Sequence, residues 1–134
     1  MEKGSAVLMS TQALLPRERQ RLRKRSEFVT VTTHGRAWFH HLLVLRVMPN
    51  DLPSSRTGIT VSKNVGGAVV RNRIRRRLHE ILYRSRPFAA LDLVFSARRG
   101  AAQANFWQLQ HAVETLISRA SAWESSPTVR RGKE

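Results

Sequence analysis

The sequence has 134 residues, 41% of them hydrophobic, which fits one small domain with a single modest core. Lysine and arginine number 24 against 9 aspartates and glutamates, so the formal net charge is +15 and a polyanionic partner is favoured. The absence of cysteine excludes disulfides, cysteine zinc sites and thiol nucleophiles. No apolar run approaches the roughly 18 residues that cross a bilayer, and residues 1–20 lack the pattern of a secretory signal, so we expect a cytoplasmic protein.

The two ends of the chain differ in composition from its middle. Residues 1–16 have no sustained period and end at Pro16, which predicts a flexible leader. Residues 17–122 are expected to form the folded domain, and residues 123–134 a flexible basic tail. The domain opens on a basic run, residues 17–25 (RERQRLRKR), in which Leu22 is the only apolar residue. This run is either a solvated arm or a phosphate contact.

A short helix is expected next, with Ser26 as its N-cap, Phe28 and Val31 on one side, and Gly35 at its end, although the β-branched run VTVTT would also suit a strand. The apolar residues 37–47 predict one buried strand. Residues 56–62 alternate in polarity as a second strand, close enough in sequence to pair with the first as a hairpin.

A long helix is predicted over residues 68–83, because apolar residues recur there at helical spacing: Val70, Ile74, Leu78, Ile81 and Leu82. Residues 91–96 read as a third strand, and Asn105 as the N-cap of a last helix. The apolar face of that helix comprises Phe106, Leu109, Val113, Leu116, Ile117 and Ala120. The resulting order is α-β-β-α-β-α, an α+β domain with a sheet of at least three strands packed by helices.

The predicted long helix also carries a dense group of arginines. The segment from Lys63 reads KNVGGAVVRNRIRRR and supplies Arg71, Arg73, Arg75, Arg76 and Arg77. Like charges at these spacings repel, and Glu80 is the one acid nearby, so phosphates of a partner are expected to supply the compensating charge. The alternative is a solvated cationic face. A helix-turn-helix is disfavoured, because a strand precedes this helix instead of another helix.

Two details of this segment suit a polyanion. Asn72 is a poor residue for a helix interior, but its amide can both donate and accept a bond to a backbone or a base. Gly66 and Gly67 leave backbone amides uncovered at the start of the helix, where anions bind readily, although the spacing is not that of a Walker motif.

The chain offers little for metal or acid–base chemistry of its own. His40 and His41 are adjacent in a predicted strand, so they are expected on opposite faces, and no histidine has zinc-site spacing. The nine acids are scattered along the chain, whereas two-metal hydrolysis needs clustered carboxylates. The tryptophans Trp38, Trp107 and Trp123 are expected in the core or at its rim, in preference to base platforms.

Three stretches, RLRKRSEFVTV, RTGITVSKNVGGAVVRNRIRRRLHEIL and DLVFSARRGAA, occur in the order in which they occur in the protein subunit of bacterial ribonuclease P, which this sequence resembles over residues 17–120. The resemblance is most specific from Ser62 onwards. It implies a ribosomal protein S5 domain 2-like fold, with a left-handed crossover between parallel strands. It also implies an RNA-binding cofactor without a catalytic site of its own, which joins a catalytic RNA, one protein per RNA, to remove the 5′ leader of precursor tRNA with Mg²⁺ held mainly by the RNA.

Carried over by position, the resemblance implies that the arginine helix faces the catalytic RNA. The residues concerned are Lys63, Arg71, Asn72, Arg73, Arg75 and Arg76. The leader is expected to stack on Phe28, although packing of Phe28 in the core is the alternative. Thr32 and Arg46 stand where some relatives carry further aromatics, so they are expected to offer polar contacts to the leader. A ribosome-associated RNA-binding protein and a DNA-binding module are the alternative functions.

Overall fold

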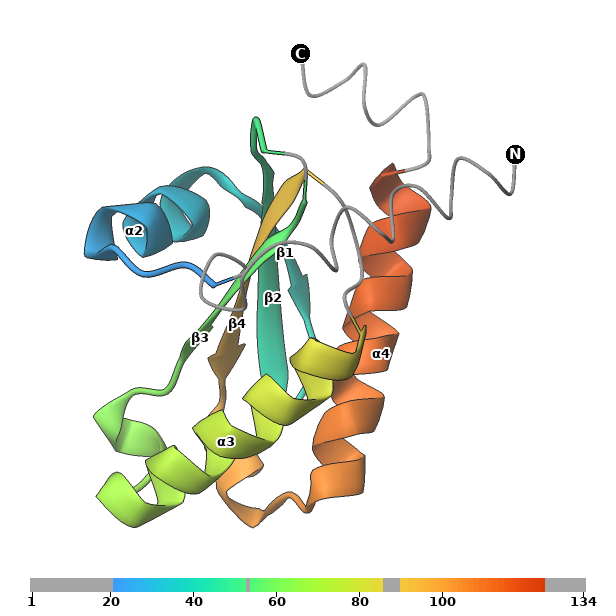
Figure 1. Ribbon diagram of the computed structural model, residues 1–134. Helices are drawn as coiled ribbons and strands as arrows, with labels where there is room; N and C mark the ends of the chain where they lie inside the picture. The colour runs from blue at the N-terminus through green and yellow to red at the C-terminus, as the bar shows by residue number, and fades with distance from the viewer. Residues whose placement is uncertain (1–20, 53, 86–89, 125–134) are drawn as a thin grey trace.

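The computed structural model describes residues 21–52, 54–85 and 90–124 (Figure 1). Its helices are α2 (Arg25–His34), α3 (Ala68–Ser85) and α4 (Phe106–Glu124), with 3-10 turns η2 (Lys63–Val65) and η3 (Arg99–Gln103). Its strands are β1 (Arg36–Phe39), β2 (Leu43–Pro49), β3 (Arg56–Thr60) and β4 (Leu91–Ala97). The α+β class is therefore confirmed, with one strand more than the expected order. The predicted leader and most of the predicted tail lie outside the described residues.

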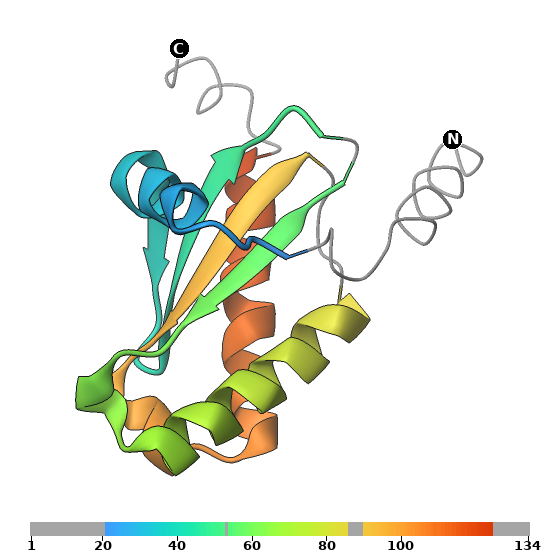
Figure 2. The same ribbon diagram turned by 60° about the vertical axis from the view of Figure 1, so that its left-hand side comes forward.

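The four strands form one mixed sheet in the order β1-β2-β4-β3. Neighbours are antiparallel except β3 and β4, which run parallel and are joined by α3. Helix α2 covers one face of the sheet and α3 and α4 cover the other, as the two ribbon views show (Figures 1 and 2). In both views the β3–α3–β4 crossover is left-handed, against the strong general preference for the right-handed sense.

The main core lies between the sheet and the helices α3 and α4. Alternate residues of the strands face it, among them Leu43, Leu45, Leu93 and Phe95, all fully buried. The predicted helical stripes supply the other side: Ile74, Leu78, Ile81 and Leu82 from α3, and Leu109, Val113, Leu116 and Ala120 from α4. The spacing of apolar residues thus predicted correctly which face of each helix is buried.

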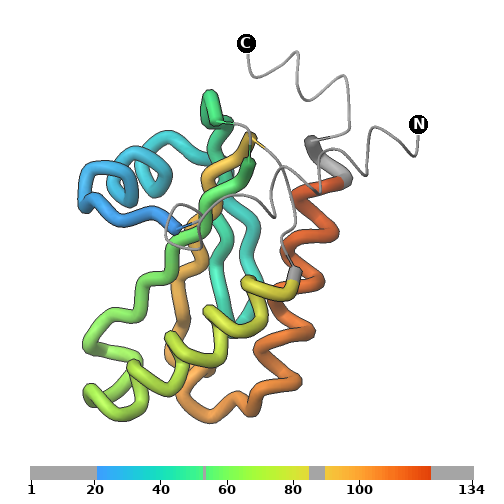
Figure 3. The backbone as a smooth tube through the Cα atoms, viewed as in Figure 1, coloured from blue at the N-terminus to red at the C-terminus, as the bar shows by residue number. Residues whose placement is uncertain are grey.

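A smaller core fixes α2 on the opposite face. Val31 of α2 and Leu22, from the segment before it, pack on Val94 of β4, with Phe28 and Met48 at the edge. Leu22 also donates its amide to the carbonyl of Thr57, 2.8 Å away, so the last part of the basic run follows β3 (Figure 3). The one apolar residue of that run therefore anchors the described part of the run, residues 21–25, to the sheet.

The strand predicted over residues 37–47 is wrong as a single element, because the chain turns at His40–Leu42 into a β1–β2 hairpin. The amide of Leu42 donates to Nδ1 of His40 at 3.0 Å and closes this turn. The two histidine rings accordingly stack, with centroids 4.4 Å apart, instead of pointing to opposite faces.

The predicted hairpin between residues 37–47 and 56–62 is also wrong, because β4 lies between β2 and β3. Residues 91–95 of β4 are buried without interruption, which is typical of a strand covered on both faces. Such a strand takes the centre of the sheet and leaves β3 at the edge.

The predicted helix caps have different outcomes. Asn105 does cap α4: its Oδ1 accepts from the amide of Gln108 and its own amide donates to Oε1 of Gln108, both at 2.8 Å. Ser26 does not cap α2, because the helix already begins at Arg25 and the side chain of Glu27 accepts the amides of Arg23 and Lys24.

Gly35 does end α2, but in an extended conformation, where a Cβ would lie 2.5 Å from the carbonyl oxygen of Val31. No helix in the described ranges is long and apolar enough to cross a membrane.

Candidate nucleic-acid interface

Helix α3 begins directly after the glycine pair. The amide of Arg71 donates to the carbonyl of Gly67 at 2.9 Å, which closes the first helical turn. A Cβ on Gly66 would lie 2.9 Å from Cγ1 of Val70, so glycine is required there by a close approach, whereas a Cβ on Gly67 would meet open space. The sequence prediction that this pair opens the helix is confirmed.

The α3 arginines fall into two sets because the apolar stripe lies between them. On one flank, Arg73 and Arg77 donate to the carbonyls of Ala102 and Ala104, at 3.1 and 3.0 Å. These two bonds tie the helix to η3 and to the start of α4. The Nε of Arg73 is buried with no hydrogen-bond partner in the structure, so this side chain bonds through its terminal nitrogen.

The other flank and the outer face of α3 hold the remaining cations. Arg71 donates Nε to the carbonyl of Gly66 at 3.1 Å, and Arg75 donates Nη1 to Oδ1 of Asn72 at 3.1 Å. Asn72 and Arg76 are exposed. Lys63, in the turn η2 that precedes the helix, is also exposed, and these residues together are called the cationic surface of α3.

No carboxylate of the described residues neutralises this surface. The ion pairs of the described residues join Arg56 to Glu27 and Asp92, and Arg84 to Glu80, and none lies on this surface. Glu80 lies one turn after Arg76, but its Oε2 is 2.8 Å from Arg84. The hydrogen bonds of the other α3 arginines, Arg71, Arg73, Arg75 and Arg77, go to neutral oxygens, so their positive charge stays available to a polyanion.

Phe28 of α2 stands between two adjoining hollows along β3, of about 580 and 310 Å³. Its ring lies over Gly58, where a Cβ would be 2.5 Å from Cε2 of Phe28, so a larger residue there would displace the ring. The basic residues that line the two hollows are four arginines and one histidine: Arg21, Arg23, Arg25, Arg75 and His79. An aromatic ring among cations along a groove is the arrangement that binds single-stranded nucleic acid.

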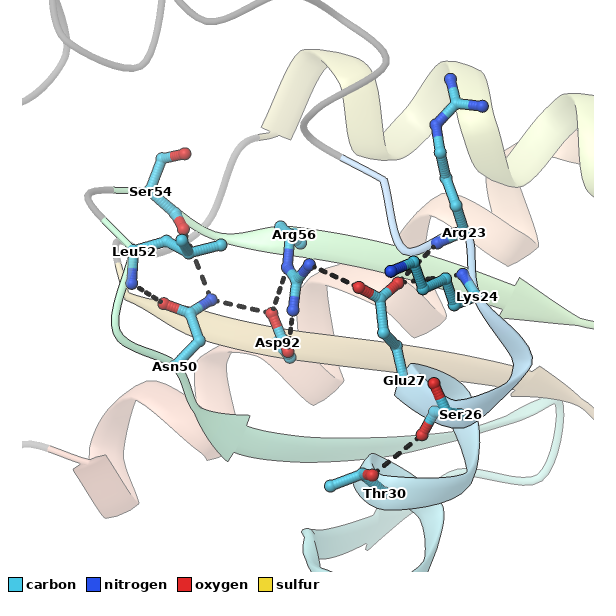
Figure 4. Close-up of polar contacts among 10 residues, drawn as sticks. All are labelled: Arg23, Lys24, Ser26, Glu27, Thr30, Asn50, Leu52, Ser54, Arg56 and Asp92. Atoms are coloured by element: carbon cyan, nitrogen blue, oxygen red, sulfur yellow. Dashed lines mark hydrogen bonds and ion pairs between the residues drawn. The ribbon is translucent and has the colours of Figure 1, made fainter.

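An ionic network holds α2, and with it Phe28, against the sheet (Figure 4). Arg56 of β3 donates Nε and Nη2 to the carboxylate of Asp92, at 2.9 and 2.8 Å, and Nη1 to Glu27 of α2 at 2.9 Å. Asn50 donates to the same Asp92 carboxylate at 2.7 Å. The hydrogen bonds that Arg56 donates to Asp92 first, and then the charge of Asp92 and the bond to Glu27 with its charge, raise the pKa of Arg56 further above its usual range, although burial opposes this.

The network also acts on Glu27. Burial alone would raise the pKa of its carboxyl, but the amides of Arg23 and Lys24 and the guanidinium of Arg56 stabilise the charged form more strongly. The pKa of Glu27 is therefore lowered from its ordinary value of 4.5.

The structure does not bring the other two predicted leader contacts into these hollows. Thr32 is exposed, and its hydroxyl donates to the carbonyls of Phe28 and Val29 in its own helix. Arg46 is half-buried in β2, in a row across the sheet with Val94 and Gly58.

The sequence reasoning missed the position of Arg21, Arg23 and Arg25 beside Phe28. The signal was Leu22, whose burial places them there.

The expectation for the tryptophans holds for Trp38, which packs at the edge of the main core. It is wrong for Trp107, which is 69% exposed. The side chain of Trp123 lies outside the described part of the structure. No group of three or more histidines, aspartates or glutamates that could hold a metal ion occurs among the described residues.

Fold and surface together define a small basic α+β domain built to bind RNA. The Ribonuclease P family model matches residues 15–121, and the chain belongs to the ribonuclease P protein family. Members of this family are the protein component of an endoribonuclease of tRNA processing.

Similar proteins agree with this assignment. The ribonuclease P protein component of Roseiflexus castenholzii is 45% identical over 103 residues, which cover 75% of this chain and 84% of the relative. That of Caldanaerobacter subterraneus is 38% identical over 106 residues, covering 78% and 91%.

Solved structures agree as well. A mutant RNase P protein of Staphylococcus aureus superposes with a TM-score of 0.73 at 27% identity, covering 78% of this chain and 90% of that one. The RNase P protein of Thermotoga maritima gives a TM-score of 0.68 at 27% identity, covering 74% and 96%.

The lowered pKa of Glu27 predicts a contribution to stability that is present above its ordinary value of 4.5 and is lost as the pH falls through the lower value of the folded protein. Replacing Glu27 with glutamine should therefore flatten the loss of stability on acidification. Urea unfolding from pH 6 to pH 3 measures this. Glu114→Gln, a change to an exposed glutamate of α4, is the matched control and should keep the wild-type slope. An unchanged slope in Glu27→Gln would contradict the role given to the network.

Proposed function

We propose that this protein binds the catalytic RNA of ribonuclease P through the cationic surface of α3. The residues concerned are Lys63, Arg71, Asn72, Arg73, Arg75 and Arg76. The observation that carries the proposal is that no described carboxylate pairs with these arginines, while an apolar stripe on the same helix holds them in place. Arg73 has a second role, because its bond to Ala102 also orders the neighbouring loop.

The groove beside Phe28 binds the single-stranded 5′ leader of precursor tRNA in this proposal. A leader base stacks on the phenyl ring, and the arginines that line the two hollows contact its phosphates. Thr32 and Arg46, outside the hollows, extend the path with polar contacts. Arg75 lines the groove and also belongs to the α3 surface, so the two RNA sites meet at this residue.

In this proposal the catalytic RNA performs the hydrolysis, with Mg²⁺ held mainly by the RNA, and the protein acts in the cytoplasm as one copy per RNA. The protein supplies positive charge and substrate affinity, so its effect should be largest when Mg²⁺ is scarce. Reconstitution tests this directly: the purified protein added to the catalytic RNA should accelerate cleavage of precursor tRNA at low Mg²⁺. No acceleration at any protein concentration would refute the proposal.

Arg71→Ala and Arg76→Ala should each weaken binding of the catalytic RNA, because each removes a charge that α3 does not neutralise itself. Each lost phosphate contact should lower the slope of log K against log salt by roughly 0.7–0.9. Filter binding between 50 and 300 mM salt measures the slope.

Arg84→Ala is the matched control, since it removes an arginine of the same helix that already pairs with Glu80. Its slope should equal that of the wild type. Equal slopes for all three variants would show that the charges of Arg71 and Arg76 face solvent alone.

Phe28→Ala should weaken the binding of precursor tRNA to the reconstituted enzyme more than the binding of mature tRNA, because only the precursor has a leader that can stack on the ring. A lost stacking contact corresponds to roughly 1–3 kcal/mol. Val29→Ala, the next residue and 48% exposed, should leave both affinities unchanged. Equal losses for both tRNAs in Phe28→Ala would assign the ring to packing alone.

A further inference from the structure

A third hollow, of about 520 Å³, lies at the other edge of the sheet, between the β1–β2 turn and the start of α4. The groups that define it are three histidines and one tryptophan: His40 and His41 from the turn, and Trp107 and His111 from α4. Nothing in the function proposed above uses these residues.

Two arginines lie beside the turn that forms one side of the hollow. Arg98 and Arg119 donate to the carbonyls of His40 and Phe39, at 3.1 and 3.0 Å, and so place two permanent charges around the turn. None of the residues lining the hollow is acidic. Glu114, one turn beyond His111 on α4, accepts a bond from Gln110 at 3.1 Å. Burial first, and then the interactions with His41, Arg119 and His111, lower the pKa of His40, so its imidazole offers a neutral N–H donor to the hollow.

Trp107 gives this hollow an aromatic wall. Its side chain is 69% exposed, yet it is fixed at its base, because Phe106 packs against the core and meets the indole edge to face at 5.1 Å and 87°. The reciprocal bonds between Asn105 and Gln108 fix the helix turn that carries it. A large aromatic ring held in solvent beside the imidazole rings of three histidines suits a nucleobase with its phosphate.

The hollow adjoins the flank of α3 that carries Arg73 and Arg77. Arg77 of α3 donates to the carbonyl of Ala104, and Ala104 lines the hollow. The groove of Phe28, by contrast, follows β3, which is the opposite edge strand from β1 in the order β1-β2-β4-β3. An RNA that lies on α3 can therefore continue across η3 into this hollow, whereas a leader in the groove lies at the other edge of the sheet.

We propose that this hollow binds an unstacked nucleotide of the same catalytic RNA that α3 holds, with the base on Trp107 and the phosphate on the histidines. This inference rests on the proposed function and adds a second, separate contact to it. The contact adds the stacking of one base to the charge attraction that α3 supplies.

Trp107→Ala and His111→Gln test the inference by titration of the catalytic RNA at fixed salt. Trp107→Ala should weaken binding about tenfold, within the range of one stacked base. Trp107→Phe, which keeps an aromatic face, should restore most of that affinity. His111→Gln should weaken binding, whereas His34→Gln, at an exposed histidine of α2, should not. Chemical probing of the bound RNA should show nucleotides that wild-type protein protects and Trp107→Ala leaves reactive.

Two outcomes overturn the inference. One is wild-type affinity and protection in Trp107→Ala. The other is a loss confined to precursor tRNA in the holoenzyme, which would make the substrate the occupant. The thermal melt of each variant checks that it folds. If Trp107→Ala does not fold, the comparison of RNA affinity between His111→Gln and His34→Gln decides: equal affinities overturn the inference. Arg71→Ala separates the two proposals: if it weakens binding while Trp107→Ala and His111→Gln do not, the proposed function stands and this hollow is not an RNA site.

Discussion

Repulsion among the arginines of α3 is the constraint on which the rest of the structure depends. Arg71, Arg75 and Arg76 lie within two turns of one another, and the ion pairs of the described residues involve other arginines. Glu27 and Asp92 hold Arg56, and Glu80 holds Arg84. The helix forms because Ile74, Leu78 and Leu82 are buried against the sheet and α4, and this burial outweighs a repulsion of a few tenths of a kcal/mol per pair. The domain thus presents unneutralised positive charge on a helix that is packed firmly against the core.

The topology explains why this surplus lies beside the groove. The left-handed crossover returns the chain from edge strand β3 to the central strand β4 and sets α3 next to β3, so that Arg75 and Phe28 line the same hollow. The ion pair between Arg56 and Glu27 holds α2 against β3. The bonds from Arg73 and Arg77 hold η3 and the residue after it against α3. These side-chain bonds therefore fix the position of the groove beside Phe28 and of the α3 flank that carries Arg73 and Arg77.

Features that depend on residues close together in the sequence could be predicted from it. The stripes of α3 and α4, the cap at Asn105 and the arginine cluster are such features. Features that depend on strand pairing could not: the turn at His40 is closed by a side-chain bond, and the central place of β4 follows from burial on both faces. The packing of Leu22 could not be predicted either, because a single apolar residue in a basic run forms no periodic pattern. Its contact with Val94 nevertheless determines where Arg21, Arg23 and Arg25 lie.

The salt dependence of the free protein's stability tests the central claim most directly. If the α3 arginines repel one another without internal partners, added NaCl should raise the free energy of unfolding as it screens them, and Arg71→Gln with Arg76→Gln should reduce that rise. Urea unfolding in the absence of RNA, from 20 to 500 mM NaCl, gives both quantities. A stability that falls with salt, or a rise that the double variant leaves unchanged, would show that these charges are already neutralised within the chain.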